Sequence, residues 1–413
     1  MKQRWIGLLD CNNFFVSCER LFRPDLVKIP VVVLSSNDGC IVARSQEVKD
    51  IGVPMGVPYF QVKDSLKDIG TVSFSSNFTL YRDVSRRVFA VMREELNTIE
   101  QYSIDEAFFT VNDDPLEVSR RIKKAVERQV GIPVSVGVAA SKTQAKYAAS
   151  KAKKELGVCV LDNEAWKSEI PNIPLAKIWG VGGGMELRYK QHGLITVHDF
   201  LQADVTSIQK LFGVGGVRLR RELEGQPIFT VSHSLQQQKS LISSRSFNSS
   251  VLEYSVLADA VAYHVRHAAA DLRAMSLKTN SLQVSIRPGR HSDFFLRGGS
   301  KEAILSNPTN DTILLLQTAM KLLQELYEPG VPYKKAGITC NHLVSAEIEQ
   351  KTLFFNDRDH TELLRTVDTV NQRFGNEALL LGSRLRNEEW QSRKDLRSPG
   401  YTTQWQALAK ARA

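Results

Sequence analysis

The chain has 413 residues, of which 42% are hydrophobic and 24% charged, as in an ordinary soluble globular protein. Because single hydrophobic cores stop growing at about 250–300 residues, several domains are predicted. No stretch of about 18 apolar residues is present, so no membrane span is expected, and the N-terminus lacks the cleavage site of a secretory signal. A formal net charge of +9 favours a polyanionic partner.

Cysteine usage indicates a reducing compartment. The five cysteines are odd in number, scattered, and never spaced as C-x-x-C. This argues against both a disulfide framework and a structural zinc site, and it predicts a cytoplasmic protein. The residues are Cys11, Cys18, Cys40, Cys159 and Cys340.

In the N-terminal part, predicted strands and helices alternate without a simple βαβ repeat, so α+β is the expected fold class. Strands are predicted at 5–10, 31–34, around 105–106 and at 134–138, and helices at 80–97, 116–129 and 142–155. Residues 52–58 have the glycine and proline content of a loop.

The pattern changes near residue 165. From there to about 232, short helices separated by glycine clusters are expected, and the polar segment 236–240 is interpreted as a linker. Residues 241–345 are predicted to form a separate α/β unit, with helices near 251–275 and 310–327 and strands near 278–287 and 334–344. This unit and residues 382–413 both carry more basic than acidic residues.

Three acidic residues are predicted to lie in or beside buried strands. Asp10 ends an apolar run, and the adjacent Asp105 and Glu106 are enclosed by apolar residues. A buried carboxylate is costly unless a cation or a hydrogen-bond donor compensates it, and adjacent carboxylates repel each other. Convergence on Mg²⁺ would explain the pattern, because two ions can activate an attacking oxygen and stabilise a leaving phosphate. Pairing with Arg or Lys is the open alternative.

The predicted helix 142–155 carries lysines on one face. At 100° per residue, Lys142, Lys146 and Lys153 fall within a sector of about 40°, and Ala149 lies on the same face. Cations this close together call for a compensating anion, such as a nucleotide triphosphate or a DNA backbone. An ordinary solvated lysine face is the alternative.

Two glycine clusters share one pattern. Gly180 and Gly182 flank a valine before a predicted helix, and Gly213 and Gly215 do the same further along the chain. A tight glycine turn exposes backbone N–H groups at a helix N-terminus, which favours phosphate binding without base readout. The pair resembles helix-hairpin-helix motifs that hold a DNA backbone, with plain helix connectors as the alternative.

The adjacent rings of Phe14 and Phe15 follow Asp10 closely. If Asp10 binds a metal-bound triphosphate, these rings lie near its sugar. A bulky ring there would exclude a ribose 2′-OH by simple overlap. Ordinary core packing is the alternative.

Taken together, these motifs resemble the Y-family translesion DNA polymerases over essentially the whole chain. The most specific are Ser-Ile-Asp-Glu at 103–106 and Asn-Asp-Gly-Cys at 37–40. The second of these and the tail at 398–403 are similar to the UmuC branch of that family. The other matching segments are Asp10–Phe15, Phe74–Asn77, the lysine helix and the two Gly-Val-Gly clusters.

The resemblance implies an α+β, right-handed polymerase with palm, small fingers, a helical helix-hairpin-helix thumb and an α/β little finger. The expected boundaries are 1–14 and 78–164 for the palm, 15–77 for the fingers, 165–234 for the thumb, 235–243 for a linker, 244–345 for the little finger and 346–413 for a C-terminal tail.

The resemblance also implies roles for single residues. Asp10, Asp105 and Glu106 would be catalytic and would hold two Mg²⁺ with the Cys11 carbonyl. Phe15 would be the steric gate against ribonucleotides, with Phe14 packed beside it. Lys153 and Lys49 would bind the triphosphate, although Lys49 replaces a common Arg and the tyrosine that often precedes that Arg is absent. The DNA contacts implied are Lys142, Lys146, Gly180, Gly182, Gly213 and Gly215.

The implied substrates are primer–template DNA and dNTPs, in error-prone synthesis past damaged bases during the SOS response. The peptide Gln350–Phe354 resembles a sliding-clamp ligand anchored by Gln350, Leu353 and Phe354, although Lys351 replaces the usual leucine. A chance Leu-Phe pair is the alternative. UmuC relatives also work with a UmuD′-type dimer and a RecA filament.

Three other classes of function fit these motifs less well. A catalytically inactive DNA-binding scaffold could use the same fold, but all three carboxylates are present. A nucleotidyl cyclase also uses two-metal carboxylates, yet the glycine pair and the basic C-terminal half fit DNA better. A phosphatase is disfavoured because Asn12 occupies the place of its expected second aspartate.

Overall fold

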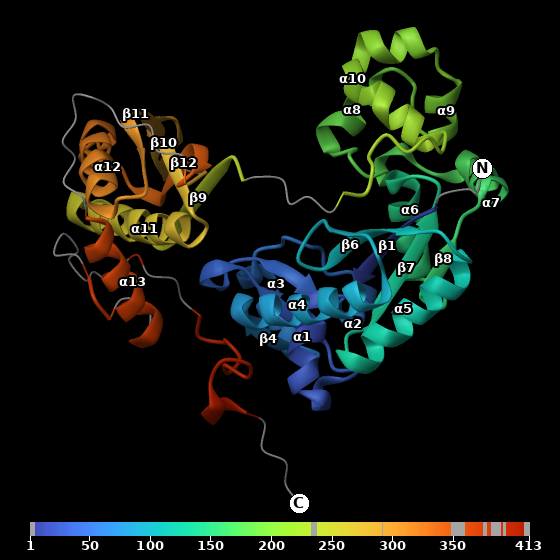
Figure 1. The fold of residues 1–413 in the computed structure, drawn as a ribbon, viewed down its shortest axis with the longest axis horizontal. Coiled ribbons are helices and arrows are strands. Elements are labelled where there is room, and N and C mark those ends of the chain that lie inside the picture. Colours follow the sequence, from blue (N-terminus) through green and yellow to red (C-terminus); the bar gives the residue numbers. More distant parts are fainter. Residues whose placement is uncertain are drawn as a thin grey trace, which may run out of the picture. The chain divides into compact units, whose positions relative to one another are not determined.

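The structure is a computed structural model that describes residues 5–232, 238–290, 292–347, 360–374, 378–380, 390 and 394–408. The chain forms two compact units. The first comprises Met1–Ser35, Gly39–Leu235 and Leu396–Ala413, and the second Ser36–Asp38 and Gln236–Asp395. Both units mix helices and sheets (Figure 1), which confirms the predicted α+β class. Among the described helices, none is long and apolar enough to cross a lipid bilayer.

A five-stranded sheet with the order β5-β6-β1-β7-β8 lies at the centre of the first unit. Its neighbouring strands are antiparallel except for β7 and β8. Strand β1 occupies the middle, and its apolar residues are buried, as expected for a run without polar alternation. The bounds are Trp5–Cys11 for β1, Ile99–Gln101 for β5, Glu106–Val111 for β6, Val134–Ala139 for β7 and Val158–Val160 for β8.

Alternating side chains along β1 determine which helix covers which face of this sheet. Leu9 packs into the core beneath helices α4 and α5, whereas Leu8 packs into the core beneath α6. Helices α4 and α5 thus cover one face and α6 the other (Figure 1). Asp10, two residues after Leu8, falls on the α6 face. The bounds are Phe78–Glu95 for α4, Pro115–Gln129 for α5 and Lys142–Ala152 for α6.

Helix α6 approaches the sheet so closely that only glycine fits beneath it. A Cβ atom at Gly137 on β7 would lie 2.0 Å from the backbone nitrogen of Ala149. The buried face of α6 consists largely of alanines, which permit this approach. Since α6 carries Lys146 and is followed by Lys153, the contact sets the height of both lysines above the sheet.

We therefore expect Gly137→Ala to destabilise the first unit by about 3 kcal/mol, because a backbone atom cannot move aside as a side chain can. The measurement is the urea midpoint of its unfolding transition, followed by far-UV circular dichroism. Gly215→Ala is the matched control, because nothing lies within 4 Å of its added Cβ and alanine favours the helix. Equal midpoints for the two variants would contradict the expectation.

A smaller three-stranded sheet with the order β3-β2-β4 adjoins the N-terminal helix. Strand β2 pairs antiparallel with β3 and parallel with β4. One face of β2 packs with α2 and α3 in a small separate core, and its other face belongs to the main core of the unit. The bounds are Phe14–Phe22 for α1, Val31–Leu34 for β2, Ile41–Arg44 for β3, Gln46–Asp50 for α2, Tyr59–Asp68 for α3 and Val72–Ser75 for β4.

Helices α7 to α10 follow the central sheet and are joined to it by a buried acid. Glu222, fully buried near the end of α10, accepts a hydrogen bond of 3.1 Å from the Thr143 amide in the first turn of α6. The donors at a helix N-terminus stabilise such a carboxylate. The bounds are Asn163–Glu169 for α7, Gly183–Gln191 for α8, Val197–Gln202 for α9 and Val205–Leu223 for α10.

The second unit contains a four-stranded antiparallel sheet with the order β11-β10-β12-β9, and helices α11 and α12 pack on it. The two strands predicted from the sequence, β10 and β12, are the central ones. The bounds are Ser240–Val251 for β9, Tyr254–Ala274 for α11, Leu277–Pro288 for β10, Gly299–Thr309 for β11, Thr312–Leu326 for α12, Tyr333–Ser345 for β12 and Thr361–Phe374 for α13.

Candidate active site

Two of the three predicted carboxylates face each other across adjacent strands. Asp10 on β1 is directly opposite Glu106 on β6 in the antiparallel register. Like charges opposite each other on neighbouring strands repel, and Asp10 is only 8% exposed. Asp105 immediately precedes β6, and its carbonyl accepts a hydrogen bond of 2.9 Å from the Cys11 amide. The fold thus brings the backbone of the three acids and of Cys11 together from segments far apart in the sequence.

A serine that the sequence analysis did not single out orients the acidic pair. The Ser103 hydroxyl donates to Asp105 Oδ1 at 2.6 Å and accepts from the Asp105 and Glu106 amides at 3.2 and 3.0 Å. Serine commonly closes such local turns through its side chain. Its position two residues before an aspartate was a usable signal, because that spacing allows this turn.

Each lysine of the predicted stripe pairs with an acid of the central sheet. The ammonium groups of Lys153 and Lys146 lie 2.8 Å from the carboxylates of Asp10 and Glu106, respectively. Lys142 lies 2.6 Å from Glu100. The pairing of buried acids with lysine, left open above, therefore occurs here.

The lysines differ in how accessible they are. The Lys142 side chain is 6% exposed and its ammonium lies over the Phe108 ring, so the protein itself engages it. The Lys153 side chain is 40% exposed and the Lys146 side chain 26%. Only Lys146 and Lys153 can turn toward a ligand without leaving a buried position.

The environment of Asp10 penalises its negative charge. Burial raises the pKa of Asp10 to about 7, although the Lys153 ammonium acts in the opposite direction and the nearby Glu106 adds to the rise. Burial also raises the pKa of the Cys11 thiol well above its usual range. Because hard divalent cations prefer oxygen ligands, the backbone carbonyl is the candidate ligand atom of Cys11.

The two adjacent phenylalanines occupy different environments. Phe14 is 3% exposed and packs in the main core of the unit. Phe15 is partly exposed, and its ring stacks on Tyr81 at a centroid distance of 4.5 Å and an interplanar angle of 13°. The edge of Phe78 completes this aromatic group at 5.7 Å from Phe15. Of the two adjacent phenylalanines, Phe14 is a core residue, and Phe15 is the one whose ring is partly exposed.

A second basic group lies near Asp10. The Lys49 ammonium donates to the Asn13 side chain, and its pKa is lowered by burial and by the charges of Lys153 and Arg44. Arg44, not singled out from the sequence, has a buried Nε without a hydrogen-bond partner among the described residues. Mutually repelling cations with an unused donor favour an anionic ligand.

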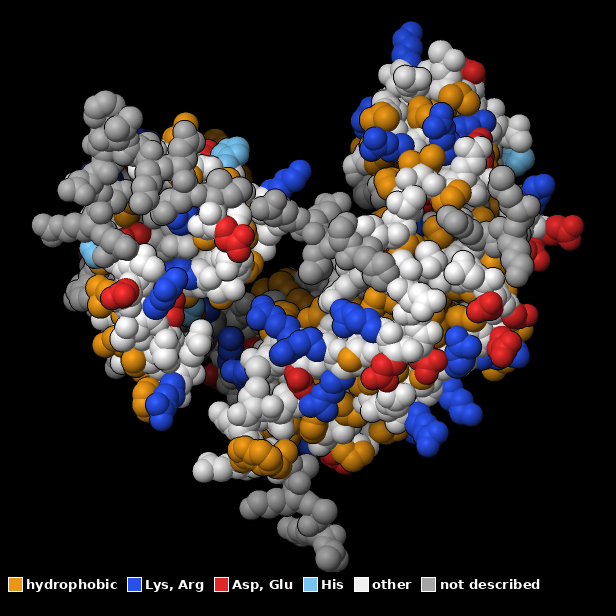
Figure 2. Space-filling view, in the orientation of Figure 1, with side chains coloured by type: hydrophobic (Ala, Val, Ile, Leu, Met, Phe, Trp, Pro, Cys, Tyr) orange, Lys and Arg blue, Asp and Glu red, His pale blue; other side chains and the backbone are white. Residues whose placement is uncertain are grey.

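The glycine clusters share a backbone geometry. Gly180 and Gly213 have φ values of +89° and +65°, which favour glycine. Helix α8 begins at Gly183, and Gly213 marks a kink inside α10, so a helix follows each cluster. Nothing lies within 4 Å of a Cβ placed on Gly182 or Gly215, so both turns leave open space. Figure 2 shows Lys and Arg side chains among hydrophobic ones over these helices.

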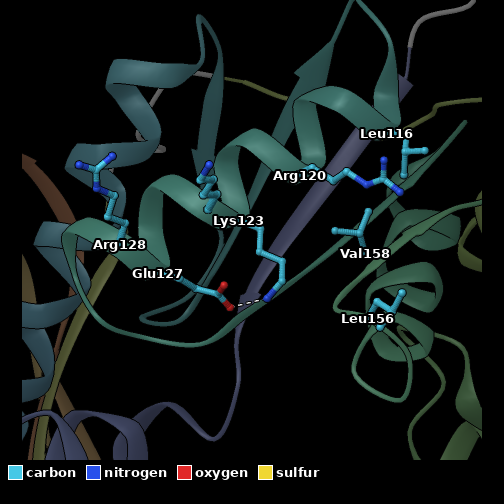
Figure 3. Close-up of a pocket in the computed structure, with 8 residues that line it drawn as sticks. Leu116, Arg120, Lys123, Glu127, Arg128, Leu156 and Val158 are labelled. Atoms are coloured by element: carbon cyan, nitrogen blue, oxygen red, sulfur yellow. Dashed lines mark hydrogen bonds and ion pairs between the residues drawn. The ribbon is translucent and has the colours of Figure 1, made fainter.

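The clamp-like residues Gln350, Leu353 and Phe354 lie outside the described residues. A basic pocket of about 430 Å³ lies along α5, lined among others by Arg120, Lys123 and Arg128 (Figure 3). Since α5 and α6 cover opposite faces of the central sheet, this pocket is not part of the carboxylate site.

Comparison with known proteins places this arrangement in a family. Residues 9–150 match the impB/mucB/samB family, 238–353 match the C-terminal domain of the same family, and 361–411 match a domain of unknown function. The chain is 32% identical to Protein UmuC of Salmonella typhimurium strain LT2, over 98% of this chain and 100% of that protein. It is 33% identical to Protein MucB of Escherichia coli, over 97% and 98%.

Among solved structures, a Y-family DNA polymerase chimera of Dbh and Dpo4 has a TM-score of 0.71, with 19% identity over 83% of this chain and 99% of that one. The fold is thus that of a Y-family DNA polymerase, as predicted. The chain belongs to the UmuC branch of this family, the translesion DNA polymerases. The enzyme class is DNA-directed DNA polymerase, and the inactive scaffold is not favoured.

Proposed function

We propose that this chain is the catalytic subunit of an error-prone translesion polymerase, with Asp10, Asp105 and Glu106 as its catalytic carboxylates. It adds dNTPs to a primer 3′-OH opposite damaged template bases in the SOS response. The observation that carries the proposal is the cross-strand pair of Asp10 and Glu106, each held by a lysine of the α6 segment. Two mutually repelling acids at the end of a central strand are kept in place at a cost in stability, which favours a functional role.

The donor set suits a divalent ion such as Mg²⁺, because hard cations prefer carboxylate and carbonyl oxygens. Asp10, Asp105, Glu106 and the Cys11 carbonyl would hold two such ions, which when bound supply charge neutralisation and activation of the primer hydroxyl. Among the described residues, no group of three or more His, Cys, Asp or Glu side chains is arranged so that it could hold a metal ion. In this structure Lys153 and Lys146 form ion pairs with the carboxylates of Asp10 and Glu106. We infer that these ion pairs break when the divalent ions bind.

Released lysines have a further use at this site. Lys153 would then face the triphosphate together with Lys49 and Arg44, and the charge of the triphosphate would replace that of Asp10 as the partner of Lys153. Phe15 would pack against the deoxyribose and exclude a 2′-OH, with Phe14 supporting it from the core. The chain's task is positioning, since phosphoryl transfer needs little covalent work from protein.

DNA contacts would come from the glycine turns at Gly180, Gly182, Gly213 and Gly215, which offer backbone amides to phosphates. Of the two lysines proposed to contact DNA, Lys146 is more exposed than Lys142, and Lys142 would act through its pairing with Glu100. We also propose, on the family resemblance, a UmuD′-type dimer, a RecA filament and the sliding clamp as partners, and the cytoplasmic nucleoid as the place of action.

Primer extension across an abasic site tests this function. With Mg²⁺, dNTPs and the partner proteins added in turn, we expect wild type to insert opposite the lesion and Asp105→Ala to lose insertion. Fluorescence anisotropy should give both proteins the same affinity for primer–template DNA. Extension by Asp105→Ala at the wild-type rate would refute the metal assignment. DNA binding without extension by wild type under every condition would favour the scaffold.

A further inference from the structure

The C-terminal segment folds back onto the unit that carries the active site. Residues 396–408 lie within the region that matches a domain of unknown function, and they belong to the first unit. The Ser75 amide donates to the Leu396 carbonyl at 3.1 Å, and the Leu396 amide donates to the Ser75 hydroxyl at 3.0 Å. Because β4 is an edge strand, the segment extends the edge of the small sheet.

The segment next binds the N-terminus of α4. Asn77, which caps this helix, donates from its side-chain amide to the Ser398 hydroxyl at 3.0 Å. The Arg397 guanidinium donates to the Asn77 side-chain oxygen at 3.1 Å. Asn77 and Ser398 are 1% and 6% exposed, so these are interior bonds rather than surface contacts. Removing one partner would leave a buried polar atom unsatisfied.

A buried acid connects this contact to the aromatic group beside the active site. Glu19 of α1 is fully buried, and its Oε1 accepts a hydrogen bond of 2.7 Å from the Tyr81 hydroxyl. Burial raises the pKa of Glu19, and the Tyr81 hydroxyl, the Ser398 hydroxyl and the Arg397 charge oppose that rise. Ser398 and Arg397 thus favour the charged form of the carboxyl that holds the Tyr81 ring, although the Oε2 atom of Glu19 has no hydrogen-bond partner among the described residues.

The same ring supports Phe15. Tyr81 stacks flat against Phe15, so the direction of the Phe15 ring depends on where Tyr81 is held. At the far end of α1, Tyr401 of the segment stacks on Phe22 at 4.7 Å with an interplanar angle of 4°. The segment therefore contacts both helices that carry the aromatic group: α1 with Phe15, and α4 with Tyr81.

We propose that residues 396–401 position the steric gate: by bracing α1 against α4 through Asn77, Glu19 and Phe22, they fix the Tyr81–Phe15 stack that selects deoxyribonucleotides. This inference rests on the proposed function, because it assigns Phe15 to the sugar. Arg397, Ser398 and Tyr401 are positioning residues that act through Tyr81 and do not touch the nucleotide.

The test compares full-length variants in single-nucleotide insertion on undamaged DNA, with dCTP and CTP measured separately. We expect Tyr401→Ala and Arg397→Ala/Ser398→Ala to lower the ratio of kcat/KM for dCTP to that for CTP by about tenfold, as one lost packing contact does. kcat for dCTP should stay within about twofold. Tyr401→Phe, which keeps the stacked ring, should restore the wild-type ratio, and Trp405→Ala, which removes an 87% exposed side chain, is the control.

A second measurement does not depend on activity. Hydrogen exchange of the α1 and α4 amides should become faster in Tyr401→Ala than in Tyr401→Phe. An unchanged sugar ratio with wild-type exchange overturns the proposal. Wild type that fails to insert dCTP overturns the proposed function instead, and the exchange result still decides whether the segment braces the helices. If Tyr401→Ala fails to fold, Ser398→Ala replaces it in both measurements, and Tyr401→Phe remains the conservative control.

Discussion

Glu106→Gln is expected to reduce the rate of primer extension by about 10³-fold or more, equivalent to about 4 kcal/mol of transition-state stabilisation. The amide keeps the size and one acceptor oxygen of the carboxylate but loses the charge that a divalent ion requires. The measurement is single-turnover insertion of dNTP with Mg²⁺ at saturating DNA.

The thermal stability of Glu106→Gln should depend on the lost charge much less than its activity does. Glu106 is opposite Asp10 on the next strand, so removing its charge relieves repulsion but also removes the 2.8 Å ion pair with Lys146. Because the two effects oppose each other, the thermal midpoint should change little. Glu95→Gln is the matched control, because Glu95 pairs with Arg121 at 3.1 Å on the other face of the sheet. A Glu106→Gln enzyme that extends primers at near-wild-type rates would show that the carboxylate is not needed.

The positions of strands β1, β2, β6 and β7 along the chain, and of the acids beside them, could be predicted because they depend on local pattern. An apolar run ending in Asp10 fixes a buried strand, and the enclosed Asp105–Glu106 pair fixes a second. The lysine stripe was visible from helical spacing, but its partners were not. A sequence reveals that a charge requires compensation, whereas only the fold reveals that Asp10 and Glu106 provide it.

Two kinds of feature could not be predicted from the sequence. One is strands whose residues do not alternate between apolar and polar, and the other is contacts between segments far apart in the chain. Strands β9 and β11 are the edge strands of their sheet, and both are largely exposed and polar, so no period of two marks them. Strand β9 begins at Ser240, inside the segment expected as a linker. The tail contacts of Ser398 with Asn77 join residues more than three hundred positions apart, and no local pattern encodes them.

Phe15→Ala is expected to raise kcat/KM for ribonucleotides by about 10–100-fold relative to that for deoxyribonucleotides of the same base. Phe15 is partly exposed, with its ring fixed by Tyr81, so removing it opens space where a 2′-OH would otherwise overlap. The measurement is the ratio of insertion efficiencies for dNTP and rNTP on undamaged DNA, where lesion geometry does not contribute.

Phe14→Ala separates this steric effect from a loss of packing. Phe14 is 3% exposed in the main core, so its truncation should lower stability by about 3–5 kcal/mol while leaving the sugar ratio close to wild type. If both variants gained ribonucleotide use equally, a loosened α1 would explain the gain and Phe15 would not be the gate. If neither gained it, Phe78, the 44% exposed neighbour whose edge meets Phe15, becomes the residue to replace next, because it is the remaining exposed ring of this aromatic group.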